Sequence, residues 1–413
     1  MIPKFRFVTL LLFCLFLLFS QGLSAQECDT QRYYDEIFDF KRISEVKFGE
    51  APQPLPLRRN HIKELFMDVY QPKGDTLSAR PLIIWAFGGA YVFGSKTSPD
   101  IKALSKAFAK RGYVNAAIDY RLSKDLLLNN DLTNCYEALL KATHDMRASI
   151  RYFYKDAATL NRFKIDTNRI YIGGVSAGAL AALHIAHFDE LDEVPIEVDS
   201  LFQAMGGFLG NSGNAGYSEN IAGVISLCGA LMDSAWISPA VTTPIVSMHG
   251  TADKVVPYGS DTITILGVNL EVDGSSSIHH QLDQYDIKND FYTFQGAGHT
   301  PFVLNKAYMD TTIRFVRDFL YELVCDDNTI DIPGNIIVPT EKVSSSVYPN
   351  PNRGAFYFRI DTDEISSISI FDAFGSAVFS DLKVHQGLNH FDLNLPKKLG
   401  LIERTIGILI FIF

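Results

Sequence analysis

The chain has 413 residues, of which 47% are hydrophobic, 12% aromatic and 20% charged, and this composition is too apolar for a disordered chain. Its 37 basic and 47 acidic residues give a formal net charge of −10, and no basic cluster stands out. The charge argues against nucleic acid bound through its phosphates, while the length allows one large domain and a smaller one.

The first 25 residues have the pattern of a secretory signal peptide. Lys4 and Arg6 precede an apolar run at 7–19, and Leu23-Ser24-Ala25 provides small residues for cleavage. The run is shorter than the roughly 20 residues of a membrane-spanning helix. Cys14 lies inside the run and not at the cleavage site, which argues against a lipoprotein. We therefore expect residues 1–25 to be removed during export through the periplasm.

Residues 26–330 alternate short apolar segments with longer helical stretches, which predicts an α/β domain with a mostly parallel sheet flanked by helices. The predicted strands are 65–70, 82–87, 114–120, 170–172, 222–227, 244–249 and 291–294. The predicted helices are 101–111, 135–153 and 306–323, and Asn134 with Glu137 forms a capping box before the second.

The composition changes after residue 330. Residues 331–346 are rich in Pro, Gly and Ser and predict a linker. In residues 347–413, short alternating segments at 356–360, 365–372, 377–379 and 389–393 predict a small β-sandwich. We therefore expect a second, smaller domain at 347–413.

Four cysteines remain once Cys14 is removed with the signal peptide: Cys28, Cys135, Cys228 and Cys325. An even number in an exported protein permits two disulfides, and three connectivities are open. Pairing Cys28 with Cys325 would join the two ends of the main domain. The wide spacings, with no C-x-x-C pair, argue against a zinc site.

The sharpest chemical motif is Gly174-Val175-Ser176-Ala177-Gly178, a G-x-S-x-G between a predicted strand and a predicted helix. Small residues around a serine in such a sharp turn expose its hydroxyl. A serine nucleophile needs a base, and the base needs an orienting acid. His299 and Asp253 lie in loops after later predicted strands, so both reach the carboxyl edge of the sheet.

The order Ser176, Asp253, His299 resembles that of the α/β-hydrolase superfamily, in particular its carboxylesterase/lipase branch. The segments 85–95 (Trp-Ala-Phe-Gly-Gly-Ala-Tyr-Val-Phe-Gly-Ser) and 119–122 (Asp-Tyr-Arg-Leu) are similar to the H-G-G-G-F and D-Y-R-L stretches of that branch. Phe87 replaces the family histidine, and Ala90 replaces the third glycine. The resemblance covers roughly residues 60–320.

The resemblance implies a serine carboxylic-ester hydrolase with Ser176 as nucleophile, His299 as base, Asp253 as acid and no cofactor. It implies an oxyanion hole formed by the backbone N–H groups of Gly89, Ala90 and Ala177. We expect Tyr91 and Phe93 to line the substrate pocket, with core packing as the alternative. The expected substrates are small or polymer-borne esters.

Other polar residues have plainer interpretations. His184 and His187 lie three apart in the predicted helix after Ser176, but no third metal ligand is indicated. The acidic run 189–193 lacks the spacing of a calcium loop and predicts a solvated loop. His249 is expected to shape the Asp253 loop.

The segment Val347-Tyr348-Pro349-Asn350-Pro351, followed by Gly354, resembles the C-terminal sorting domain of the type IX secretion system. This resemblance implies the outer-membrane secretion machinery as a partner and an extracellular or cell-surface destination. Residues 396–413 depart from the family pattern, because the usual closing G-x-Y strand is missing. Two alternatives to the esterase remain: a serine peptidase on the same fold, and a catalytically silent binding protein.

Overall fold

The computed structural model describes residues 28, 31–54, 60–127, 131–265 and 267–325, together with the strands of a C-terminal unit. The chain divides into two compact units, Met1–Ile330 and Asp331–Phe413. The predicted signal peptide at 1–25 and nearly all of the predicted linker at 331–346 lie outside the described residues.

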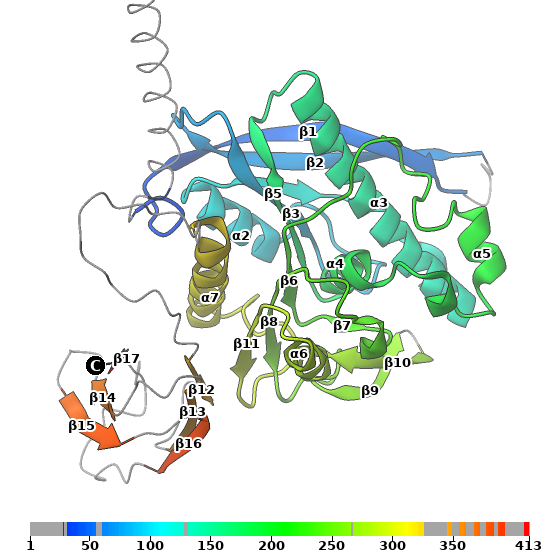
Figure 1. The fold of residues 1–413 in the computed structure, drawn as a ribbon. Helices are drawn as coiled ribbons and strands as arrows, with labels where there is room; N and C mark the ends of the chain where they lie inside the picture. Colours follow the sequence, from blue (N-terminus) through cyan, green and yellow to red (C-terminus); the bar gives the residue numbers. More distant parts are fainter. Residues whose placement is uncertain are drawn as a thin grey trace, which may run out of the picture. The chain divides into compact units, whose positions relative to one another are not determined.

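An eight-stranded sheet forms the centre of the first unit, in the order β1-β2-β4-β3-β5-β6-β8-β11 (Figure 1). Its strands are β1 (Asp39–Pro52), β2 (Ile62–Lys73), β3 (Arg80–Ala86), β4 (Val114–Ile118), β5 (Ile165–Val175), β6 (Gly223–Leu227), β8 (Ile245–Gly250) and β11 (Asn289–Phe294). The pairs β1–β2 and β2–β4 are antiparallel, and all the other pairs are parallel. The sheet confirms the predicted α/β class and contains each of the seven predicted strands.

Helices cover both faces of this sheet. They are α2 (Pro99–Ala109), α3 (Leu132–Ala158), α4 (Ala177–His187), α5 (Asp199–Ala204), α6 (Ser275–Gln284) and α7 (Lys306–Cys325). α2 and α7 contact each other on one face, and α3 packs against α4 on the other (Figure 1). The sheet core is apolar because all seven residues of β3 and all five of β4 are buried between the two layers.

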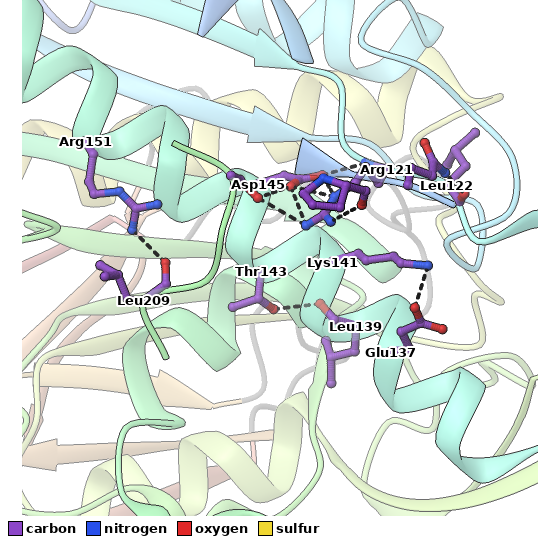
Figure 2. Close-up of polar contacts among 12 residues, drawn as sticks. Arg121, Leu122, Glu137, Leu139, Lys141, Thr143, Asp145, Arg151 and Leu209 are labelled. Atoms are coloured by element: carbon purple, nitrogen blue, oxygen red, sulfur yellow. Dashed lines mark hydrogen bonds and ion pairs between the residues drawn. The ribbon is translucent and has the colours of Figure 1, made fainter. Parts of the chain in front are cut away.

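Helix α3 begins earlier than expected. Its N-cap is Asp131, whose Oδ1 accepts the N–H of Asn134 at 2.8 Å. Glu137 instead forms an i,i+4 ion pair with Lys141 at 3.0 Å (Figure 2). The predicted capping box was therefore wrong, because an equally good capping residue lies one turn earlier.

Two regions of strand were not predicted. β1 is mostly exposed and, among the described strands, pairs with β2 alone, so its polar sequence carries little of the apolar signal of a buried strand. β9 (Ser260–Ile265) and β10 (Val268–Gly274) form a hairpin that joins β7 (Ala230–Leu231) in a separate three-stranded sheet. Alternate hairpin positions are buried, and this alternation of Ile, Leu and Val is visible in the sequence.

A buried polar network connects α3 to the loops around it (Figure 2). The guanidinium of Arg121 lies 2.9 Å from Oδ1 of Asp145, and both side chains are almost completely buried. Ser212 donates to the same Oδ1 at 2.6 Å, and Arg121 also donates to the carbonyl of Pro52 at 2.9 Å. Arg151 donates to the carbonyl of Leu209 at 3.0 Å. These bonds hold the segment after β4 and the loop around Ser212 against α3.

Cys28 and Cys325 form a disulfide, which confirms that pairing, whereas Cys135 and Cys228 are free and buried. The bridge joins the start of the described chain to the last residue of α7. The second disulfide that an even cysteine count permits is not formed. No helix in the described part of the chain combines the length and apolar character needed to cross a bilayer.

The second unit contains two three-stranded antiparallel sheets, β12-β13-β16 and β15-β14-β17. The strands are β12 (Ser345–Tyr348), β13 (Ala355–Ile360), β14 (Ser367–Phe371), β15 (Ala377–Lys383), β16 (Gly387–Asp392) and β17 (Leu409–Ile412). The four predicted strand regions are present. β17 pairs with β14 in the terminal segment for which the sequence predicted no strand, and residues 349–354 lie outside the described residues.

Candidate active site

Ser176 lies in a sharp turn between β5 and α4. Its backbone has φ 53° and ψ −121°, a region that a residue with a side chain rarely adopts. A Cβ added at Gly178 would lie 2.3 Å from the carbonyl oxygen of Ala86, so glycine is required where the turn crosses the end of β3. The Ser176 hydroxyl does not cap α4, which leaves it free to meet another side chain.

A row of hydrogen bonds joins Ser176, His299 and Asp253. His299 Nε2 lies 2.9 Å from Ser176 Oγ, and His299 Nδ1 lies 2.6 Å from Asp253 Oδ2. The three residues follow β5, β11 and β8, so they meet at the carboxyl edge of the parallel sheet. In this geometry His299 can accept the Ser176 proton through Nε2 while Asp253 holds its other nitrogen as a donor.

The Asp253 carboxylate is saturated with donors. Its Oδ1 accepts the N–H groups of Val255 at 2.8 Å and Val256 at 3.0 Å. Its Oδ2 lies 2.6 Å from His299 Nδ1 and 3.2 Å from His249 Nε2. Burial raises the pKa of Asp253, but the hydrogen bonds from His249 and His299 outweigh it, so the pKa falls well below its usual range. Asp253 is therefore a carboxylate at neutral pH.

Three backbone N–H groups near Ser176 are unengaged. Within the described residues, those of Gly89, Ala90 and Ala177 donate to no protein acceptor. A Cβ added at Gly88 would lie 3.2 Å from Ser176 Cβ, so this loop runs directly against the serine turn. Ala90 adopts φ 51° despite its Cβ, so the loop keeps a glycine-like conformation there. The N-terminus of α4 adds the positive end of its dipole beside Ser176.

The segment 119–122 holds this loop in place, a role that the sequence did not reveal. Asp119 Oδ1 accepts the backbone N–H of Lys96 at 2.8 Å. The Tyr120 hydroxyl donates to the carbonyl of Phe87 at 2.9 Å, and the two rings stack at 4.2 Å. Phe87, which replaces the family histidine, therefore supplies a stacking surface that fixes the start of the loop.

The two predicted pocket residues have different environments. Tyr91 is buried and lines an apolar cavity between α3, α4 and the β9–β10 hairpin. The other residues lining it are Cys135, Tyr136, Leu139, Leu180, Met232, Ile263, Ile265, Leu270 and Val272. Phe93 is 60% exposed and is not among the residues lining this cavity or the neighbouring one around Trp236.

The other residues considered as possible metal ligands lie in different environments. His184 Nδ1 lies 2.7 Å from the carbonyl of Leu180, and both ring nitrogens of His187 lack a partner in the described chain. Cys228, His249 and Asp253 place their potential ligand atoms within 4.8 Å of one another. Burial raises the pKa of the Cys228 thiol to about 12, which keeps it protonated and disfavours metal binding there.

The sheet order and the positions of these residues define the class. A mostly parallel eight-stranded sheet carries a serine at the strand–helix turn after β5, with an aspartate after β8 and a histidine after β11. This arrangement is the α/β-hydrolase fold.

Two family models match the chain. Residues 67–204 match the family BD-FAE, and residues 346–397 match the secretion system C-terminal sorting domain. The matches confirm the resemblance to α/β-hydrolase esterases and to a sorting domain. The BD-FAE match includes Ser176 and the Gly88–Ala90 loop, and it ends before Asp253.

Curated relatives include two lipases of Geotrichum candidum. Lipase 1 is 29% identical and Lipase 2 is 28% identical over 123 residues, which is 29% of this chain and 21% of each lipase. The chain thus matches about a fifth of the length of these relatives. Similar solved structures include Thermogutta terrifontis esterase 2 phosphoramylated by tabun, at 18% identity and a TM-score of 0.47, covering 68% of this chain and 94% of that one. The apo form of the same esterase is 18% identical with a TM-score of 0.45, covering 70% and 95%.

Proposed function

We propose that this protein is an exported serine carboxylic-ester hydrolase that acts on small or polymer-linked esters. The observation that carries the proposal is the unbroken row from Asp253 through His299 to Ser176, which lies beside the unengaged N–H groups of the 88–90 loop. The BD-FAE match and the lipase relatives support the same reaction class.

The proposed reaction is a two-step acyl transfer. Ser176 Oγ attacks the ester carbonyl as its proton passes to His299 Nε2, and the oxyanion that forms accepts hydrogen bonds from the N–H groups of Gly89, Ala90 and Ala177. Each such donor contributes about 3–4 kcal/mol in acyl transfer. The alcohol leaves with the proton from His299. Water then attacks the acyl-enzyme, gives its proton to His299, and the acid is released as Ser176 regains the proton.

The test is the Ser176→Ala variant. We expect hydrolysis of p-nitrophenyl acetate to fall by at least about 10³-fold and labelling by a fluorophosphonate probe to disappear, because both require the same nucleophile. The thermal melt followed by circular dichroism should be retained.

Ser226→Ala is the matched control, since Ser226 is a buried serine on β6 whose hydroxyl has no partner in the described chain. This variant should keep both turnover and labelling. Undiminished turnover in Ser176→Ala would contradict the assignment. Cleavage of an aminoacyl p-nitroanilide without ester hydrolysis would identify a peptidase, and a wild type that is neither labelled nor active would identify a binding protein.

We also propose the route by which the protein leaves the cell. The signal-peptide pattern of residues 1–25 directs the chain to the periplasm, and the sorting domain matched at 346–397 directs it to the type IX outer-membrane machinery. The destination is the medium or the cell surface, where polymer-linked esters are accessible.

A further inference from the structure

A second imidazole lies against the carboxylate of Asp253. His249, in β8, is fully buried, and its Nε2 lies 3.2 Å from Asp253 Oδ2, the oxygen that His299 also contacts. Its other nitrogen, Nδ1, lies 2.8 Å from the hydroxyl of Ser275 at the start of α6. Ser275 is itself completely buried. A row of close polar contacts therefore continues beyond Asp253 to His249 and Ser275.

The acceptors around His249 determine which nitrogen carries the proton. Nε2 faces Asp253 Oδ2 and the carbonyl oxygen of Val256 at 3.1 Å, and neither oxygen can donate. Nε2 must therefore be a donor. In the neutral ring, Nδ1 is then an acceptor, and the Ser275 hydroxyl is placed to donate to it.

We propose that His249 is a positioning residue for the proposed hydrolysis: it holds the Asp253 carboxylate toward His299, and Ser275 anchors the opposite nitrogen of the His249 ring. Asp253 Oδ1 accepts two backbone N–H groups, and His249 Nε2 lies 3.2 Å from Oδ2, so groups beside both oxygens oppose rotation of the carboxylate away from His299. The carboxylate charge is also shared between two imidazoles, which weakens the stabilisation that it offers to the His299 imidazolium.

The Cys228 thiol and the Tyr258 ring also lie near this pair. Cys228 Sγ lies within 4.8 Å of the His249 and Asp253 ligand atoms, and burial keeps this thiol protonated. The centroid of the Tyr258 ring lies 5.8 Å from that of His249.

The test compares His249→Leu, which removes the donor, with His249→Gln, whose amide can still donate to Asp253 Oδ2. We expect His249→Leu to lower kcat about 10- to 100-fold with KM within about twofold, as is usual for residues that orient a functional group. The acidic limb of the kcat/KM profile should move to higher pH, because Asp253 then stabilises the His299 imidazolium more strongly. His249→Gln should restore most of kcat and the wild-type limb.

The Ser275→Ala variant is a second test of the proposal, in which the His249 side chain itself is left in place. This variant retains the imidazole but loses the hydroxyl that anchors its Nδ1, so we expect a smaller loss of kcat and an acidic limb displaced in the same direction. Equal activities and unmoved pH limbs in His249→Leu and His249→Gln would overturn the proposal, as would a Ser275→Ala variant indistinguishable from wild type.

The proposal rests on the proposed function, so a readout independent of turnover is needed. The low-field proton resonance of His299 Nδ1 reports its bond to Asp253 in the resting protein. We expect it to shift in His249→Leu and to stay in place in His249→Gln. If wild type lacks esterase activity, the hydrolase assignment fails. An unchanged resonance in His249→Leu overturns the role of His249 alone.

Discussion

Ser176 combines an unfavourable backbone conformation with a nearly complete loss of solvent contact. A non-glycine residue at φ 53° costs on the order of 1–3 kcal/mol, and here the packing of Gly178 against β3 maintains it. The conformation directs Oγ toward His299 and away from the end of α4. The strain is thus located at the residue whose hydroxyl must meet His299.

Buried histidines make the stability of the protein sensitive to acid. His184, His187 and His279 are almost fully buried, and burial lowers the pKa of each to about 4, while that of His144 falls to about 3. Between pH 6.5 and 4 the unfolded chain therefore binds more protons than the folded one. We expect the free energy of unfolding to decrease as pH falls through this window, by up to about 1.4 kcal/mol per pH unit for each histidine. Urea denaturation at a series of pH values measures it.

His187→Leu provides the decisive variant, because both of its ring nitrogens lack a partner in the described chain. We expect this substitution to increase stability at pH 7 by about 1–3 kcal/mol and to reduce the slope with pH. His279→Leu is the matched control: it loses the bond to Asn289 at 2.6 Å, so it should destabilise at pH 7 while also reducing the slope. If the free energy of unfolding depended on pH as steeply in both variants as in the wild type, the explanation by buried histidines would be contradicted.

At the scale of secondary-structure elements, the position of the loop between β3 and α2 depends on the segment that follows β4. The Tyr120 hydroxyl binds the carbonyl of Phe87, the residue just before the Gly88–Ala90 segment. We expect Tyr120→Phe to destabilise the protein by about 1–3 kcal/mol, since the Phe87 carbonyl loses its partner. Turnover should fall by about tenfold as the loop N–H groups shift away from Ser176. Ester kinetics and urea denaturation measure the two effects.

Tyr113→Phe is the control for this substitution. Tyr113 is completely buried, and its hydroxyl has no partner among the described residues. Removing that hydroxyl should leave activity unchanged and stability unchanged or higher. A Tyr120→Phe variant with the properties of Tyr113→Phe would show that stacking alone fixes the loop.

The strands that could be predicted from the sequence are those whose residues are buried, because burial requires apolar side chains. β3 and the second half of β5 carry continuous apolar runs, and β4 is apolar apart from Asn115, because both faces of the central sheet are covered by helices. β1 was missed because it is an exposed edge strand whose register depends on β2. The capping of α3 was misassigned because Asp131 and Asn134 are both good caps, and in the structure Asp131 is the one whose side chain accepts a backbone N–H of the first turn.

At the scale of the whole molecule, the two units have separate roles in the proposed function. The Ser176–His299–Asp253 row lies entirely within the first unit, whose ends are joined by the Cys28–Cys325 disulfide. A bridge that closes so long a segment restricts the unfolded chain strongly in entropic models. The first unit thus contains every residue on which the proposed chemistry depends.

Removing residues 347–413 should therefore affect export and leave chemistry intact. In a bacterium with a type IX system, we expect the truncated chain to remain in the periplasm, with the ester-hydrolysis rate of the purified protein unchanged. Immunoblots of medium and periplasm measure the location. Full-length Ser176→Ala should still reach the medium, and a truncated chain found there would contradict the role of the second unit.

The sequence by itself determined the α/β class and the type of residue at each position of the row, because motif spacing and apolar periodicity are local properties. It left three cysteine pairings open, and only the fold brings Cys28 to Cys325. The positions of His249 and Ser275 behind Asp253, and of Tyr120 behind Phe87, were also decided by tertiary structure. Their contacts join residues far apart in the chain or on different elements, and such contacts form only when the sheet and its loops pack together.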